Sequence, residues 1–269
     1  EDADFFAKQM LNYKNVWYDQ EGFMWGRQSD GSWEPDFSKI RWGNPFTEGS
    51  TWHYSWSVMH NIADLIELMD GREAFCDKLD ELVTTSPDFD FGHYGFEIHE
   101  MTEMVACNMG QYAHGNQPVH HVLYLWNYAG QPWKSQKWVR HAVNTLYGPE
   151  PDGLCGDEDN GQMSAWYLFS ALGFYPVCPG EPMYVFGSPL FEKAKLHLPN
   201  GKTFEIAAPG NSAENIYIQS AILNGETWDK TWIPHEAIAK GGRVEFVMGA
   251  EPNEAWATGA NAAPFSVSE

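Results

Sequence analysis

The chain has 269 residues, of which 43% are hydrophobic, so it is long and apolar enough to bury a core as one large domain or two smaller ones. Its 37 acidic residues outnumber 16 basic ones, and the net charge of −21 excludes a protein that binds nucleic acid through clustered Lys and Arg. No apolar run reaches about 18 residues, so the sequence predicts no membrane span.

Most of the first 172 residues have the hydrophobic spacing or the flanking residues of helices. The clearest helix is 56–69, because Ile62, Leu65, Ile66 and Met69 fall on one face and Gly71 follows as a stop. We predict helices at residues 5–16, 56–69, 73–83, 100–114, 119–129, 133–146 and 161–172.

The pattern changes near residues 178–182, where short runs of β-forming residues separated by turn signals begin. Asn224-Gly225 and Gly241-Gly242 are such signals, and they favour antiparallel connections. We predict strands at residues 184–186, 194–198, 203–207, 216–222 and 243–248.

Successive antiparallel helices joined by long loops favour an (α/α)₆ toroid, of which the chain would hold about half. The predicted fold class is therefore α+β and multidomain. Residues 1–180 are expected to form the helical toroid portion that carries the chemistry, and residues 181–269 a small antiparallel β-sandwich.

Tryptophan and cysteine usage narrows the possible chemistry. The 13 Trp residues fit either a large aromatic core or stacking on sugar rings, because an indole combines a flat apolar face with one N–H donor. The four cysteines include no CxxC pair, which excludes a zinc ribbon. Cys155 and Cys178 both lie in loop-like stretches and are the favoured pair if a disulfide forms.

Three adjacent acids, Asp157, Glu158 and Asp159, precede the predicted helix 161–172. One acid suffices to cap a helix, so capping alone explains only part of this cluster. Three neighbouring carboxylates repel one another unless a cation or a substrate occupies them. The loop therefore predicts either a helix cap or a functional carboxylate site.

The segment GNPFTEGSTWHYSW places Glu48 in a loop among Trp42, Trp52, Tyr54 and Trp56. A carboxyl among aromatic rings loses solvation, which favours its protonated form, as the acid of a glycosidase requires. The alternative is a solvated Glu near the start of a helix.

Two further segments collect polar side chains. In IHEMTEM, His99 and Glu103 share a helix face, but a zinc protease motif would have a second His where Glu103 stands. Oxygen donors suit calcium better, and an ordinary acidic helix is the alternative. In QYAHGNQPVHH, Asn116 and Gln117 could donate hydrogen bonds to sugar hydroxyls or cap a helix.

Taken together, the motifs resemble glycoside hydrolase family 92, the calcium-dependent α-mannosidases. The resemblance rests on NPFTEGSTWHYSW, QYAHGNQPVHH, YLWNYAGQPWKSQ, GDEDNGQMSAWYLFSALGFYPVCPG and YVFGSPLFEKAKLHLPNGKTF. It implies an N-terminal β-sandwich, an (α/α)₆ toroid and a C-terminal β element. The chain is expected to be the later part of such an enzyme, and the N-terminal domain or a self-association partner is expected to complete it.

The resemblance also implies roles for single residues. It implies that Glu48 is the general acid, Asp159 the general base and Asp157 a second essential carboxylate. Glu103 falls at a calcium-ligand position, and Asp159 is expected to share this role. The remaining expected substrate contacts are His99 and Glu100 in the leaving-group subsite, Asn116, Gln117 (which departs from members that read GNEP), and Trp52.

The implied function is exo-hydrolysis of terminal α-linked mannose, with an α-1,2 preference, from glycans outside the cell or in the periplasm. Inversion requires the two carboxyls roughly 6.5–9.5 Å apart, so that a water fits between base and sugar. Calcium is expected to bind two mannose hydroxyls and distort the ring. The alternative is a fragment that binds mannose-containing glycans without cutting them.

Overall fold

The computed structural model describes residues 2–268, which fold into two compact units. Of the described residues, unit 1 comprises 2–58 and 64–119, and unit 2 comprises 59–63 and 120–268. Within residues 2–268, no helix is both long and apolar enough to cross a bilayer.

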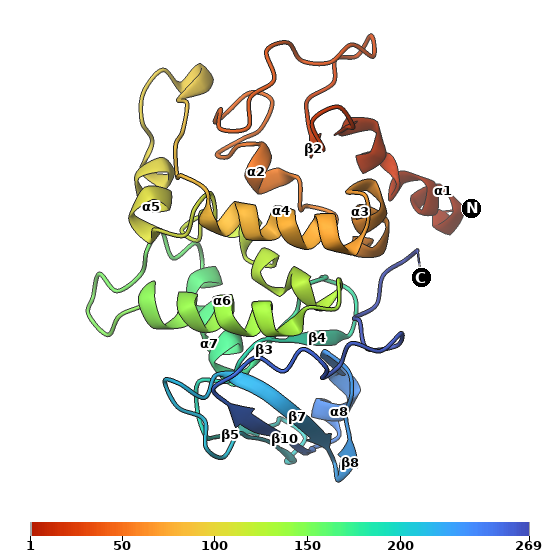
Figure 1. Cartoon of the computed structure of the whole chain (residues 1–269), viewed down its shortest axis with the longest axis vertical. Coiled ribbons are helices and arrows are strands. Elements are labelled where there is room, and N and C mark those ends of the chain that lie inside the picture. Colours follow the sequence, from red (N-terminus) through yellow and green to blue (C-terminus); the bar gives the residue numbers. More distant parts are fainter. Residues whose placement is uncertain (1, 269) are drawn as a thin grey trace. The chain divides into compact units, whose positions relative to one another are not determined.

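Unit 1 is mainly helical, with one short hairpin (Figure 1). Its hairpin pairs β1 (Trp17–Tyr18) with β2 (Phe23–Met24). Its helices are α1 (Asp2–Gln9), α2 (Thr51–Tyr54), most of α3 (Ile62–Leu68), α4 (Arg72–Thr84) and α5 (His99–Cys107), with 3₁₀ turns η1 (Asn12–Val16), η2 (Gly92–Tyr94) and η3 (Gln117–Val119).

The core of unit 1 is built from one face of α4 and a cluster beneath α5. The buried residues of α4 recur at helical spacing and are Phe75, Cys76, Leu79, Leu82 and Val83. Met101 and Met104 of α5 pack with Trp42 and Ala113. Trp42 lies six residues before Glu48, so this packing anchors the start of the segment that leads to Glu48.

Unit 2 combines helices with two sheets. Its helices are α6 (Pro132–Thr145), α7 (Gln162–Leu172) and the short α8 (His235–Ala239), preceded by the 3₁₀ helix η4 (Val122–Asn127). Its strands are β3 (Phe174–Tyr175), β4 (Met183–Phe186), β5 (Lys193–His197), β6 (Thr203–Ala207), β7 (Tyr217–Leu223), β8 (Glu226–Thr227), β9 (Trp232–Pro234) and β10 (Gly242–Gly249).

The strands form a five-stranded sheet in the order β5-β6-β10-β7-β8 and a three-stranded sheet in the order β3-β4-β9. The sheets share one apolar core, in which Phe186 of β4 meets Phe246 of β10 edge to face at 5.1 Å. Helix α6 packs against η4, α7 and β7, and Figure 1 shows these elements in green and blue.

The predicted α+β class is confirmed, but the sheet is not purely antiparallel. Strands β6 and β10 run parallel, with Val244 opposite Ile206. The segment between them, which includes β7 to β9 and α8, is long enough to return the chain to the same end of the sheet, as parallel pairing requires. Closure of a toroid, and the division at residue 180, stay predictions, since residue 180 falls inside unit 2.

Several predicted helices are shorter in the structure. The predicted helix 56–69 begins only at Ile62, and the predicted helix 100–114 ends at Cys107 because Asn108 has a φ of +51°. Segment 5–16 divides into α1 and η1, and segment 119–129 contains the 3₁₀ helix η4. The helices predicted at 73–83, 133–146 and 161–172 are confirmed.

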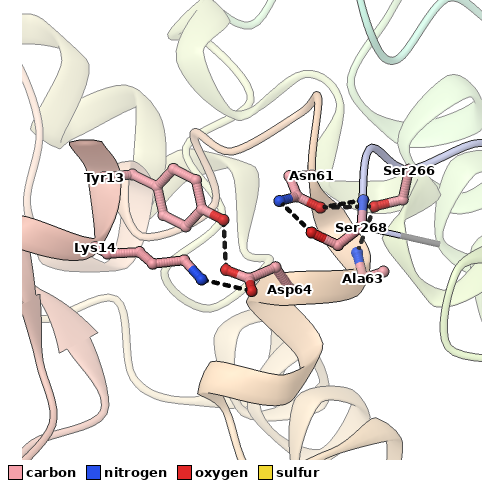
Figure 2. Close-up of polar contacts among 7 residues, drawn as sticks. All are labelled: Tyr13, Lys14, Asn61, Ala63, Asp64, Ser266 and Ser268. Atoms are coloured by element: carbon pink, nitrogen blue, oxygen red, sulfur yellow. Dashed lines mark hydrogen bonds and ion pairs between the residues drawn. The ribbon is translucent and has the colours of Figure 1, made fainter. Parts of the chain in front are cut away.

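Two polar clusters lie at the start of α3 (Figure 2). In unit 2, the side chain of Asn61 donates to Ser268 Oγ at 2.8 Å and accepts from Ser266 Oγ at 3.1 Å. The Ala63 N–H donates to Ser266 Oγ at 2.9 Å, so the start of α3 is capped by a side chain remote in sequence. In unit 1, Asp64 accepts from Lys14 Nζ at 2.7 Å and from the Tyr13 hydroxyl.

The shared core of unit 2 predicts that Phe246→Ala lowers its free energy of unfolding by about 3–5 kcal/mol, because the ring is fully buried and its loss leaves a cavity. Urea unfolding measures the effect. Phe191→Ala is the matched control, since that ring is 50% exposed. A loss from Phe246→Ala no larger than that from Phe191→Ala would contradict the predicted contribution of the buried ring.

Candidate functional site

Glu48 lies in a loop whose backbone takes an unusual conformation at this residue. Its φ is +50°, in the left-handed region that residues other than Gly, Asn and Asp rarely adopt. Among residues 2–268, Ala257 is the one other residue outside those three types with a positive φ. Such conformations persist where the surroundings hold the backbone, and they cluster at functional sites. The conformation therefore marks Glu48 independently of its sequence motif.

Two side chains from distant parts of unit 1 hold the backbone of Glu48. Its N–H donates to the Tyr94 hydroxyl at 2.9 Å, and the side-chain amide of Asn116 donates to its carbonyl at 2.6 Å. The Glu48 side chain itself is exposed. Asn116, predicted as a sugar or metal neighbour, is thus placed on the backbone of Glu48, and its contact with a ligand stays a prediction.

The helix that follows Glu48 begins with an unusual capping box. Ser50 caps α2, and the Nδ1 atom of His53 accepts the Ser50 N–H at 2.8 Å, a role that Glu or Gln usually fills. The other ring nitrogen lies 3.0 Å from the Gln111 carbonyl and donates to it, which fixes the neutral tautomer. His53 is buried, and this burial lowers its pKa to about 4 although the Gln111 carbonyl acts in the opposite direction.

Aromatic rings and a hollow flank the residues before Glu48. Phe46 stacks on Tyr54 at 5.2 Å, and the Tyr54 hydroxyl donates to the Thr47 carbonyl. A Cβ at Gly49 would lie 2.7 Å from the Tyr54 ring, so this close approach requires glycine. Burial raises the pKa of Tyr54, and the charge of Glu48 raises it further. A hollow of ≈ 420 Å³ is lined by Asn44, Pro45, Phe46, Thr47 and His93, within the size range of small-ligand sites.

The tryptophans near Glu48 in sequence do not shield it from solvent, because Glu48 is exposed. Trp42, Trp52 and Trp56 are all buried, and Trp52 packs edge to face against Phe23 at 4.8 Å. The expected tryptophan shell around Glu48 is therefore corrected: these rings belong to the core. A sugar contact of Trp52 stays a prediction.

His99, Glu100 and Glu103 come together at the start of α5. The Nδ1 atom of His99 lies 2.9 Å from Glu103 Oε1, and its Nε2 lies 3.3 Å from Glu100 Oε1. The imidazole is mostly exposed while both carboxylates are largely shielded. A single His thus links the two carboxylates predicted for the leaving-group subsite and the metal. Their contact with substrate stays a prediction, as does that of Gln117, which begins η3 and is half-buried.

Calcium fits the chemistry of this cluster. The Oε2 atom of Glu100 is buried and has no hydrogen-bond partner within residues 2–268, and carboxylate oxygens are the donors that Ca²⁺ prefers. No group of three or more His, Cys, Asp or Glu side chains in the described part of the chain is arranged to hold a metal ion. The donor type is therefore suitable, whereas a complete ligand set is not found in the described residues.

The three adjacent acids of unit 2 divide their roles. Glu158 caps α7, because its Oε1 accepts the Ser164 N–H at 3.1 Å and its Oε2 accepts the Ser164 hydroxyl at 2.7 Å. Asp157 and Asp159 are exposed. Glu158 therefore acts as the helix cap that the sequence allowed. Asp157 and Asp159 are the two acids of the loop that this capping does not explain.

The backbone of Asp159, like that of Glu48, is in the left-handed conformation. The φ angles of Asp159, Asn160 and Gly161 are +48°, +56° and +96°, so three consecutive residues occupy this region. Single left-handed residues are ordinary turn features, whereas a run of three needs support from its surroundings. This conformation turns the chain sharply just before α7 and leaves the Asp159 side chain exposed.

The first residue of α7 anchors this turn. The Gln162 side chain bonds His120 Nδ1 at 3.1 Å and the Tyr175 hydroxyl at 3.0 Å. Trp166, one turn later, donates its indole N–H to the His120 carbonyl at 2.8 Å. His120 is buried, so the HH pair of the sequence includes a packing residue that orients α7.

A second hollow, of ≈ 540 Å³, borders the start of α7 within unit 2. Tyr147, Tyr167 and Ser164 contribute to its lining, together with apolar residues. Ser164 is also the partner of Glu158, so this hollow adjoins the acidic loop. Its aromatic and hydroxyl lining is of the kind that small-molecule sites use.

The favoured Cys155–Cys178 disulfide is not formed. Cys178 is a thiol whose Sγ lies 3.8 Å from the Pro179 carbonyl. Burial of this thiol raises its pKa, and the charge of Glu181 raises it further.

Within unit 1 the structure brings together the backbone of Glu48 with Asn116, and His99 with Glu100 and Glu103. Asp157 and Asp159 belong to unit 2, so their pairing with Glu48 stays a prediction. Sequence reasoning missed Tyr94 and the role of His53. The spacing Ser50-x-x-His53 was the available signal for His53, whereas nothing near Tyr94 in sequence indicates its contact with Glu48.

The neutral, buried His53 predicts a pH-dependent contribution to stability. Its pKa is about 4 in the folded chain and 6.5 when solvated, so the unfolded chain takes up a proton first as pH falls. This contribution is complete above pH 6.5 and is lost between pH 6.5 and 4, with a total of roughly 3 kcal/mol. Urea unfolding of wild type and His53→Gln across this window should show the difference between them shrinking as pH falls. A pH-independent difference would contradict the assignment.

Comparisons with known proteins agree in placing the chain among glycosidases. The catalytic-domain model of glycosyl hydrolase family 92 matches residues 1–250. An uncharacterized secreted glycosidase of Arthroderma benhamiae is 30% identical over 223 residues, which are 82% of this chain and 26% of that protein.

Two solved structures from Bacteroides thetaiotaomicron are also similar. An inverting mannosidase of family 92 superposes with a TM-score of 0.88 and 48% identity over 99% of this chain and 36% of that one. An α-mannosidase in complex with mannoimidazole superposes with a TM-score of 0.86 and 37% identity over 96% of this chain and 34% of that one. The chain thus spans about a third of these structures and a quarter of the secreted relative.

Proposed function

We propose, because this chain belongs to glycosyl hydrolase family 92, that it carries the acid and base of an inverting exo-α-mannosidase. The observation that carries the proposal is the held, left-handed backbone of Glu48, an exposed residue that directly follows the segment 44–47 lining a ligand-sized hollow. The similarity to an inverting mannosidase supports the reaction type.

Glu48 is the proposed general acid. Departure of the sugar alcohol requires a proton on the glycosidic oxygen, and a carboxylic acid within hydrogen-bond reach supplies it. The exposure of the Glu48 side chain leaves it able to meet a substrate, while the hydrogen bonds from Tyr94 and Asn116 hold its backbone.

Asp159 is the proposed general base, with Asp157 as its neighbour. An ionised carboxylate removes a proton from the water that attacks the anomeric carbon from the face opposite the leaving group, which inverts the configuration. Glu158 is committed to Ser164, so it does not compete for this role. The exposure of Asp159 is consistent with access to water.

The substrate is proposed to be a terminal α-linked mannose of a glycan, with a preference for α-1,2 linkages. His99 and Glu100 are the proposed contacts to the sugar that leaves. The Nε2 atom of His99 lies 3.3 Å from the Glu100 carboxylate, and side chains held this close can present a defined pattern of donors and acceptors to sugar hydroxyls. Asn116, Gln117 and Trp52 are proposed as further neighbours of the substrate.

Calcium is the proposed cofactor, with Glu103 and Asp159 as ligands. When bound, Ca²⁺ would coordinate sugar hydroxyls and favour a distorted ring. The proposal rests on the oxygen-rich composition of the Glu100–Glu103 cluster. Action outside the cell or in the periplasm is proposed from the similarity to a secreted glycosidase.

The proposed acid and base roles predict that removal of either carboxyl group strongly lowers activity. Glu48→Gln and Asp159→Asn should each lower kcat by about 10²–10⁴, because each removes one proton transfer. Release of mannose from α-1,2-mannobiose by the intact protein measures this. The matched control is Asp152→Asn, an exposed acid of the same acidic segment, which should keep wild-type activity. Normal turnover by Asp159→Asn, or glycan binding without mannose release in wild type, would contradict the proposal.

Removal of calcium should abolish mannose release, and added Ca²⁺ should restore it. Dialysis against a chelator followed by titration with Ca²⁺ or Mg²⁺ measures the dependence. Ca²⁺ should be the better activator, because it accepts more oxygen ligands at longer and more variable distances than Mg²⁺ does. Full activity in excess chelator would refute the metal role while leaving the acid and base untouched.

A further inference from the structure

We propose that Tyr94, Asn116 and His53 form a clamp that positions the general acid by holding the backbone on both sides of Glu48. The contacts that define the clamp are made with the backbone at Glu48 and Ser50, so the three residues act here as positioning residues. For Asn116 this role is separate from its proposed place near the substrate. The inference rests on the proposed role of Glu48, and its tests below separate the failure of one from the failure of the other.

The first two members satisfy both polar groups of the Glu48 backbone. The Tyr94 hydroxyl accepts its N–H, and the Asn116 amide donates to its carbonyl. These partners lie 46 and 68 residues away in sequence, so the contacts exist only in the folded unit. Both contacts are within unit 1, and neither involves the Glu48 carboxyl.

These contacts explain the left-handed conformation of Glu48. A glutamate has no local reason to adopt a φ of +50°, because its side chain is too long for the short-range bonds that favour Asn or Asp there. Such a conformation persists where other interactions over-determine it. A donor and an acceptor placed on opposite sides of the residue meet this requirement.

His53 holds the chain two residues further on. Its Nδ1 accepts the Ser50 N–H and its Nε2–H donates to the Gln111 carbonyl, so one buried ring joins the start of α2 to a separate segment. The Gln111 side chain in turn donates to the carbonyls of Ser86 and Asp88. The segment 48–50 is therefore fixed at three points of its backbone.

The orientation of the Glu48 carboxyl depends directly on this backbone. A change in φ swings the side chain about the N–Cα bond, and a displacement of about 1 Å in a catalytic group can cost about 10²-fold in rate. The acid must come within about 2.6–3.2 Å of the glycosidic oxygen. Loss of the clamp should therefore weaken protonation of the leaving group and leave the water-activating step intact.

The leaving group provides a test specific to this role. Substrates with an acidic phenol as leaving group need little protonation, whereas alkyl and sugar mannosides need it fully. Tyr94→Phe should lower kcat on an alkyl or sugar mannoside about 10-fold or more, and on a dinitrophenyl mannoside by less than about 2-fold. Asn116→Asp, which keeps the size but lacks the N–H donors, should behave likewise.

The controls separate the possible failures. Glu48→Gln should show the same leaving-group dependence with a larger loss; if it does not, the acid role itself is wrong. Tyr18→Phe, which removes a hydroxyl bonded to Gln20 on the surface of unit 1, should slow neither substrate. Equal slowing of both substrates by Tyr94→Phe, or no slowing, overturns the clamp while Glu48 keeps its role.

Hydrogen exchange tests the clamp without any activity. The Glu48 amide should be protected in wild type and should exchange at least about 10-fold faster in Tyr94→Phe, because its acceptor is gone. Tyr18→Phe should leave it unchanged. Unaltered exchange of the Glu48 amide in Tyr94→Phe would overturn the clamp.

A pair of substitutions at His53 isolates its contact with Ser50. His53→Asn keeps an acceptor near the Nδ1 position, and His53→Gln keeps a donor near the Nε2 position. Under the clamp, the Asn variant should retain more of the wild-type preference between the two classes of leaving group than the Gln variant. The reverse order would remove His53 from the clamp.

Discussion

Two hydrogen bonds to the backbone of one left-handed residue, Glu48, join three separate segments of unit 1. Glu48 presents an N–H and a carbonyl that its own neighbours in sequence do not satisfy, and Tyr94 and Asn116 arrive from two separate segments to do so. Each of these segments is held in turn: Tyr94 by stacking on His93, and Asn116 by its position before η3. A solvent-exposed carboxyl is thereby attached to a backbone that has little freedom to move.

Unit 2 also contains a left-handed turn, at Asp159, but different contacts hold it. The turn at Asp159 has no side-chain clamp of its own among the described contacts, and it is fixed instead from the helix that follows. Glu158 closes the first turn of α7 through Ser164, and Gln162 ties the start of that helix to His120 and Tyr175. Structural and functional tasks are thus divided among neighbouring residues, so that one acid of the cluster supports the turn which exposes another.

Both acidic and aromatic residues of the chain include members with a structural role. The excess of carboxylates is unfavourable for contact with nucleic acid phosphates, and individual acids such as Asp64 and Glu158 are engaged in hydrogen bonds within their own units. Burial alone would raise the pKa of Asp64, but its hydrogen bonds from Lys14 and Tyr13 outweigh this and hold the pKa below its usual value. Trp42, Trp52 and Trp56, near Glu48 in sequence, are core residues, whereas Tyr54 and Tyr94 contact its loop.

The sequence by itself determined the α+β class, the regular helices α4, α6 and α7, most strands of unit 2, and the motifs that identify the family. These features depend on local spacing and on nearby caps, which a linear pattern contains. Only the tertiary structure decided the parallel pairing of β6 with β10, the late start of α3 and the partners of Glu48. Each of these rests on groups far apart in the chain, such as Ser266 with Ala63 or Asn116 with Glu48, whose meeting is set by packing and not by periodicity.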